Sequence, residues 1–221
     1  MIVIAGIFDR LFGGSRSDQA MKLYDSLEPL GYAAVPSTDN TMMSTVRSLR
    51  PIPGGIFVVK KSLVQSRSLG IRYICDLHMQ LRLSPGQAAV SEWTILTQNQ
   101  PIALTSSLII TPRLIAYEVL FKHSQLMHEV LLDLDRSFVD FYYAFARNAR
   151  GVTVPKSFQQ TMNSLSTSFP FRSDKESTSI AYFTPRGWSI LCDRLRKPDW
   201  FSELIKAANT IEESVAAFNA E

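Results

Sequence analysis

The chain has 221 residues, of which 46% are hydrophobic and 19% are charged, and its formal net charge is +3. This composition excludes an intrinsically disordered chain and a collagen-like one, and the length is sufficient for a sizeable core. No apolar run approaches the roughly 20 residues that a membrane-spanning helix needs, so we expect no transmembrane segment.

The apolar N-terminal residues 1–8 do not have the pattern of a signal peptide, because they lack a basic start and are followed at once by Asp9. The two cysteines, Cys75 and Cys192, are too few and too far apart for a disulfide framework. We therefore expect an intracellular, reducing location, cytoplasmic or nuclear, with peripheral attachment to a membrane as an alternative, and not secretion.

In the first third of the chain the pattern predicts a helix over 18–27, a short helix over 41–49 and a strand over 56–60. The strongest strand signal lies at 73–83, where apolar residues alternate with mostly polar ones. This period of two predicts one buried and one mostly solvated face for that strand.

Further strands are predicted at 94–96, 102–111 and 114–121, the last with a helix as the alternative. A long core helix is predicted from about 125 to 147, because apolar side chains recur there every three or four residues. The residues of this stripe are Met127, Val130, Leu131, Leu134, Phe138, Phe141, Tyr142 and Phe145.

Helices are also predicted near 158–165, 188–195 and 199–218, and Pro198 separates the last two. The order of the elements predicts an α+β fold. We expect an antiparallel or mixed sheet, mainly from the N-terminal half, packed with helices mainly from the C-terminal half.

We expect a single domain over 1–221. A sub-boundary near residue 150 is the alternative, with the sheet and the long helix in 1–150 and a helical appendage in 151–221.

Positive charge gathers in the first half of the chain. Between Asn40 and Cys75 there is no acidic residue, whereas six residues are basic. If they converge on one face, they form a site for phosphates of nucleic acid or lipid headgroups. The predicted anion-binding residues are Arg47, Arg50, Lys60, Lys61, Arg67 and Arg72.

Two other segments suggest contacts with partners. Residues 141–173 also lack acidic residues and carry a secondary basic patch of Arg147, Arg150, Lys156 and Arg172. The apolar N-terminal segment is either a buried first strand or, if exposed, a contact with a membrane or a second copy of the chain. The residues that we assign to this contact are Ile4, Ile7, Phe8, Leu11 and Phe12.

No motif identifies a reaction. Cys75 and His78 lie three residues apart on a predicted strand and so project from opposite faces, and His123 and His128 do not share a helix face. The carboxylates of the predicted long helix also diverge. We therefore predict no catalytic residue, no metal site and no small-molecule cofactor.

The sequence thus predicts a non-enzymatic structural or interaction protein that self-associates into a homo-oligomer and binds a polyanionic surface. RNA and an anionic membrane are both candidate partners, as for a viral matrix, coat or accessory protein. The alternative is an enzyme that acts on phosphorylated or nucleic-acid substrates through a dispersed carboxylate site.

Overall fold

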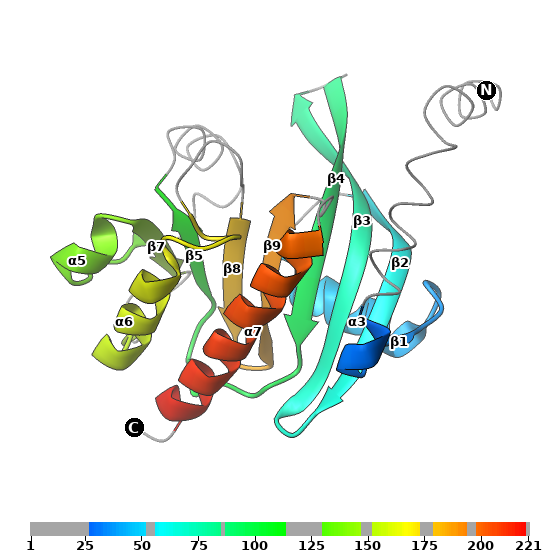
Figure 1. Cartoon of the computed structure of the whole chain (residues 1–221). Coiled ribbons are helices and arrows are strands. Elements are labelled where there is room, and N and C mark those ends of the chain that lie inside the picture. Colours follow the sequence, from blue (N-terminus) through cyan, green and yellow to red (C-terminus); the bar gives the residue numbers. More distant parts are fainter. Residues whose placement is uncertain are drawn as a thin grey trace.

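A computed structural model describes residues 27–51, 56–84, 87–113, 130–146, 152–172, 179–193 and 198–219. These residues form a large β-sheet with helices on both faces (Figure 1). The strands are β1 (Ala33–Ala34), β2 (Ile56–Arg67), β3 (Gly70–Ser84), β4 (Gln87–Gln98), β5 (Leu108–Pro112), β6 (Val130–Leu131), β7 (Tyr142–Ala146), β8 (Ser179–Thr184) and β9 (Gly187–Asp193). The helices are the 3-10 helix η1 (Glu28–Leu30) and the α-helices α3 (Asn40–Ser48), α5 (Arg136–Val139), α6 (Lys156–Leu165) and α7 (Pro198–Phe218).

The strand order in the sheet is β1-β2-β3-β4-β9-β8-β5-β7-β6, and every neighbouring pair is antiparallel. The β8–β9 hairpin, which comes late in the chain, lies between β4 and β5. The fold is therefore α+β, as predicted. The sheet is antiparallel, and it takes strands from both halves of the chain.

The first face of the sheet packs against α6 and α7. Phe158 and Met162 of α6 and Leu204 and Ile211 of α7 belong to one buried cluster with the inward side chains of the strands. Trp188 of β9 lies in the same cluster and is fully buried. This layer forms the larger of the two cores, and it places α7 diagonally across the middle of the sheet (Figure 1).

The second face packs against α3. Met42 and Val46, one helical turn apart, are fully buried in a separate cluster with Cys75 and Leu77 of β3. Because these residues occupy one side of α3, the other side of the helix faces away from the sheet. The sheet thus separates α3 from α6 and α7.

The predicted strands at 56–60, 73–83 and 94–96 are confirmed as parts of β2, β3 and β4. Tyr73, Cys75, Leu77 and Met79 are buried on one face, as the alternation predicts. The opposite face is not solvated along its middle, because Ile74 is fully buried in the same cluster as the apolar residues of α7.

The predicted helix over 125–147 is wrong for the described residues 130–146. These residues form β6, the single-turn α5 and β7. Tyr142, Ala144 and Ala146 are buried in alternation, and β7 pairs with β5 along its length. Aromatic residues favour strands, and pairing with an aliphatic partner strand outweighs the helical spacing.

The predicted helix over 188–195 is also wrong, because residues 187–193 form β9. This strand lies between β4 and β8, so both of its faces are buried and its apolar residues run almost without interruption. The helices at 41–49, 158–165 and 199–218 are confirmed as α3, α6 and α7. The predictions for 114–121, and for 18–27 except Leu27, lie outside the described residues.

Candidate functional site

The outer side of α3 carries a shallow hollow of about 590 Å³. The helix begins at Asp39, whose Oδ1 accepts a hydrogen bond from the backbone N–H of Met42 at 2.7 Å. The hollow is lined by side chains that lie on the exposed half of α3 and in the turn before it. They are Ser37, Thr38, Asn40, Met43, Ser44, Arg47 and Ser48.

Among the described residues, Arg47 is the one charged side chain that lines this hollow. Its side chain is exposed, and within the described ranges no carboxylate forms an ion pair with it. Hydroxyl and amide groups line the hollow with it. Those of Ser37, Thr38, Asn40 and Ser44 can donate hydrogen bonds, whereas the Ser48 hydroxyl already donates to the carbonyl of Thr45 at 2.9 Å. A free guanidinium among such donors fits a phosphate group, which accepts charge-assisted hydrogen bonds.

The α3 helix holds this hollow in a fixed position relative to the sheet. Asn99 at the end of β4 donates a hydrogen bond from Nδ2 to Thr45 Oγ1 at 3.2 Å. At the other end of the helix, Ser189 Oγ donates to the carbonyl of Leu49 at 2.5 Å. These bonds, together with the buried Met42 and Val46, attach α3 to two strands. The hollow therefore lies on a well-anchored element.

Arg50 lies just beyond the C-terminal end of α3 and is half-buried. Its guanidinium stacks over the ring of Phe57 on β2, at 4.6 Å from the ring centroid. Burial lowers the pKa of Arg50 from its ordinary value, and the nearby positive charge of Arg47 lowers it further. The two arginines thus repel each other, and a bound anion between them would relieve that repulsion.

Lys60 and Lys61 lie on β2, where the pairing with β3 shifts its register between Val59 and Lys61. Lys60 is exposed, and no ion pair in the described part of the chain involves it. Lys61 is half-buried and stands opposite Asp76 in the β2–β3 register. Lys60 is therefore the more accessible of these two cations.

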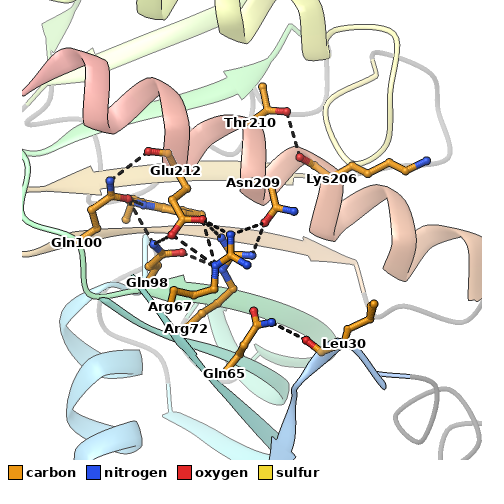
Figure 2. A network of polar contacts seen from close by, with 11 residues as sticks. Leu30, Gln65, Arg67, Arg72, Gln98, Gln100, Lys206, Asn209, Thr210 and Glu212 are labelled. Atoms are coloured by element: carbon orange, nitrogen blue, oxygen red, sulfur yellow. Dashed lines mark hydrogen bonds and ion pairs between the residues drawn. The ribbon is translucent and has the colours of Figure 1, made fainter. Parts of the chain in front are cut away.

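Arg67 and Arg72 lie elsewhere, in a polar cluster between the sheet and α7 (Figure 2). Arg67 Nη2 and Arg72 Nη2 contact Glu212 Oε2 of α7 at 2.6 and 3.0 Å. Arg72 is fully buried. As a correction to the sequence prediction, Arg72 has no exposed surface with which to contact an external polyanion. Arg67 keeps 31% of its side chain exposed but pairs with the same carboxylate.

Neutral side chains complete this cluster. Gln98 receives a hydrogen bond from Arg72 Nε at 2.8 Å and donates one from Nε2 to Glu212 Oε1 at 2.7 Å. Asn209 Oδ1 accepts from Arg72 Nη1 at 2.8 Å. Trp188 Nε1 donates to Gln100 Oε1, also at 2.8 Å. The buried charges are thus well satisfied, and the cluster joins α7 to β3, β4 and β9.

The sequence prediction missed Glu212, although a signal for it exists. On α7, Glu212 lies four residues after the buried Ala208 and next to the buried Ile211, so it occupies the apolar side of the helix. A carboxylate in such a position requires a buried cation as a partner. The hollow on α3 was also missed, and its signal is the dense run of Ser, Thr and Asn between residues 37 and 48.

The environment of Glu212 leads us to expect that the stability of the fold depends on pH. Burial alone would raise the pKa of Glu212, but hydrogen bonds from Arg67 and Gln98 and the charge of Arg72 lower it below its ordinary value of 4.5. A lowered pKa in the folded state stabilises the fold above about pH 4.5, and this contribution is lost as the pH falls. We expect the free energy of unfolding to fall in acid more steeply for the wild type than for Glu212→Gln, measured by urea unfolding at several pH values. If the free energy of unfolding fell equally with pH in both proteins, Glu212 would not be the source of the pH dependence.

The other candidate chemical groups are isolated. Cys75 is fully buried, and burial raises the pKa of its thiol, so it is a poor nucleophile. His78 Nε2 lies 3.2 Å from Glu92 Oε1 on the neighbouring strand. In the part of the chain that the structure describes, no three His, Cys, Asp or Glu side chains gather as metal ligands do.

The secondary basic patch is described only in part. Lys156 is exposed at the start of α6, and Arg172 is half-buried in the segment after that helix, on the opposite side of the sheet from Arg47. Arg147 and Arg150 lie outside the described residues. So do all five residues of the predicted N-terminal contact, Ile4, Ile7, Phe8, Leu11 and Phe12.

Among the described residues, no helix combines the length and the apolar character needed to cross a lipid bilayer. Comparisons with models of protein families, with curated proteins and with solved structures found no match. We therefore argue the function from the residues of this chain.

Proposed function

We propose that this protein is a non-enzymatic structural or interaction protein that binds a polyanionic surface through the outer side of α3. The observation that carries the proposal is the hollow around Arg47, a free guanidinium among hydroxyl and amide groups with no carboxylate in the lining. Arg50, whose guanidinium lies over the ring of Phe57, extends the positive charge from this hollow toward the start of β2.

The charge distribution along the chain supports this surface. Asp39 and Asp76 are the acids that flank the basic segment, and neither lines the hollow. Asp39 Oδ1 accepts a hydrogen bond from the N–H of Met42, and Asp76 Oδ1 accepts one from Thr94 Oγ1 at 3.1 Å. Neither of these two acids thus neutralises Arg47 in the hollow. Each phosphate contact contributes through the release of counterions, so binding must weaken as salt rises.

The proposed anion surface is smaller than the one that the sequence predicts. Arg67 and Arg72 belong to the cluster with Glu212, and Lys61 stands opposite Asp76 on β2, so the proposed surface comprises Arg47 and Arg50. For a membrane surface, each cation near the phosphates is worth roughly 1 kcal/mol. These two cations therefore support weak, salt-sensitive and reversible binding.

The test is the removal of the charge in the hollow. We expect Arg47→Gln to weaken binding to anionic vesicles or to single-stranded poly(U) RNA by about fivefold, because one contact of roughly 1 kcal/mol is lost. For RNA, the slope of log K against log salt should fall by about 0.7. Co-sedimentation with vesicles and fluorescence anisotropy with labelled RNA measure these effects over a series of salt concentrations.

Lys206→Gln is the matched control. Lys206 is exposed on α7, on the other side of the sheet, and its substitution removes the same charge. If both variants weaken binding equally, only net charge matters and the α3 surface is not the site. If the wild type binds neither vesicles nor RNA at low salt, the proposal is wrong.

Two further parts of the proposal rest on other observations. Both cysteines are free and buried, which supports a reducing, intracellular location. We also propose self-association into a homo-oligomer, for which the apolar N-terminal segment is the candidate contact on sequence grounds.

A further inference from the structure

The hollow on α3 has two chemically different ends. Arg47 lies toward the C-terminal end of the helix, whereas Ser37 and Thr38 lie in the turn before its N-terminal end. Asn40 and Ser44 lie between them, four residues apart and so on one side of the helix. The cation of the described lining is thus at one end, and neutral polar groups occupy the rest.

The neutral polar groups of the hollow are available to a ligand. All are exposed, and a hydroxyl or amide group both donates and accepts hydrogen bonds. Among the described residues, the lining side chains that form no hydrogen bond with the rest of the protein are those of Ser37, Thr38, Asn40 and Ser44. Hydroxyl groups of a ligand also donate and accept, so they match this part of the hollow.

The charges around the hollow favour one phosphate at one end. Arg47 is exposed, and Arg50 is close enough for the two positive charges to interact. At the opposite end, the carboxylate of Asp39 caps α3 next to Asn40. A phosphate beside Arg47 is therefore attracted, whereas a second one near Asp39 is repelled. A nucleic-acid strand carries a phosphate on every nucleotide, so it fits this distribution less well than a ligand with a single phosphate group.

The size of the hollow suits a small polar ligand. Its volume of about 590 Å³ lies within the roughly 300–1,000 Å³ that is typical of ligand pockets. Asn40 and Arg47 are roughly 10 Å apart along the helix axis, at 1.5 Å per residue. The half-buried Met43 adds an apolar surface between them, against which the C–H groups of a sugar or cyclitol ring can pack.

We propose that the α3 hollow binds a polyhydroxy compound that carries a single phosphate group, of the inositol phosphate or sugar phosphate class, free in solution or as the headgroup of a lipid. Arg47 and Ser44, one helical turn apart, contact the phosphate. Asn40, Thr38 and Ser37 bond to the hydroxyl groups. This inference rests on the proposed function and identifies the anion that the same site binds.

The first test compares two lipids of equal charge. Phosphatidylinositol has a polyhydroxy headgroup, whereas the headgroup of phosphatidylserine has the same net charge and no hydroxyl group. We expect the wild type to bind vesicles with phosphatidylinositol about tenfold more tightly than vesicles with the same fraction of phosphatidylserine, because additional hydrogen bonds form with the hydroxyl groups. Co-sedimentation measures both affinities.

The variant Asn40→Ala/Ser44→Ala should lose this preference for phosphatidylinositol. Both positions are exposed, and alanine favours helices, so α3 is preserved. Thr41→Ala is the matched control, because Thr41 is an exposed hydroxyl residue of the same helix outside the described lining of the hollow. We expect the control to keep the preference of the wild type. An equal loss in the two variants would overturn the inference, because the effect would then not belong to the hollow.

A second measurement uses the free compound. Ser44→Cys introduces an exposed thiol in the hollow, whereas the native Cys75 and Cys192 are fully buried and so react slowly with iodoacetamide. We expect an excess of inositol 1-phosphate to slow alkylation at position 44 severalfold, and unphosphorylated inositol to have no effect. Neither compound should protect Thr41→Cys.

The outcomes separate this inference from the proposed function. A preference for phosphatidylinositol that Asn40→Ala/Ser44→Ala removes identifies the lipid headgroup as the ligand, and protection at position 44 without that preference identifies the free compound. Equal binding to both lipids and no protection would overturn the inference, although a loss of binding in Arg47→Gln would still support the polyanion surface. Protection by poly(U) RNA but not by inositol 1-phosphate would overturn it in favour of RNA. If the wild type binds neither vesicles nor RNA, the proposed function is wrong, and protection at position 44 by the free compound would still support the hollow as its site.

Discussion

Replacing Glu212 by alanine is expected to lower the free energy of unfolding by about 3–5 kcal/mol, the usual loss when one partner of a buried ion pair is removed. The reason is Arg72, which is fully buried and would keep its charge without a carboxylate beside it. Gln98 Nε2 would lose its acceptor as well. Urea unfolding followed by circular dichroism measures the change through the shift in midpoint.

The neighbouring residue provides the control for this prediction. Glu213 is exposed on the same turn of α7, so Glu213→Ala makes the same substitution without removing a buried charge. We expect its effect to stay within about 0.5 kcal/mol. A loss for Glu212→Ala as small as that for Glu213→Ala would show that α7 is not held to the sheet by this cluster.

A second variant separates the cost of an unpaired charge from the loss of packing. In Arg72→Met/Glu212→Leu both charges disappear and apolar side chains of similar size replace them, while Arg67 remains partly exposed to water. Replacing a buried ion pair in this way is often neutral. We therefore expect the double variant to be more stable than Glu212→Ala alone.

Strands with a clear alternation could be predicted from the sequence, and so could helices with a proline at their boundary. The strand β3 shows a period of two from Tyr73 onward, and α7 begins at Pro198. In both segments the local pattern and the tertiary structure agree, because the apolar side matches the side that is buried.

The segments that could not be predicted are those in which long-range pairing decides. Residues 142–146 carry aromatic side chains that also fit a helical stripe, and only the partner strand β5, about 30 residues earlier, makes them a strand. Residues 188–192 are buried on both faces in the middle of the sheet, so they show no alternation. A single sequence contains no direct record of these partners.

The candidate site could be predicted only in part, because the partners of its cations also come from distant segments of the chain. The acid-free segment 40–75 drew attention to Arg47 and Arg50, but spacing along the chain does not say which cations face water. The side chain of Arg72 points into the protein because β3 passes beneath α7. There it forms an ion pair with Glu212, which lies on the apolar side of α7. The carboxylate of Glu212 thus neutralises Arg67 and Arg72, although their own segment of the sequence contains no acidic residue.

A second large loss of stability is expected for Gly70→Ala, at the start of β3 after the β2–β3 turn. Gly70 has a φ of 146°, and a Cβ added there would overlap the backbone carbonyl oxygen of Asn99 and lie 2.8 Å from its carbonyl carbon. Both obstacles are backbone atoms, which cannot rotate away. Together, the overlap and the unfavourable φ should lower the free energy of unfolding by about 3 kcal/mol or more. Thermal and urea unfolding measure this loss.

Gly31→Ala distinguishes the overlap from the backbone conformation. Gly31 also has a positive φ, of 82°, but its nearest neighbour would be Gln65 Nε2 at 3.7 Å, an ordinary contact. We expect this variant to lose only about 1 kcal/mol, the cost of a left-handed non-glycine residue. If Gly70→Ala lost no more than Gly31→Ala, the end of β4 would not pack against the β2–β3 turn as closely as the Asn99 N–H to Ile71 carbonyl bond of 3.0 Å implies. A larger loss at Gly70 would show that this turn fixes the end of β4, and with it Gln98 and Gln100, against α7.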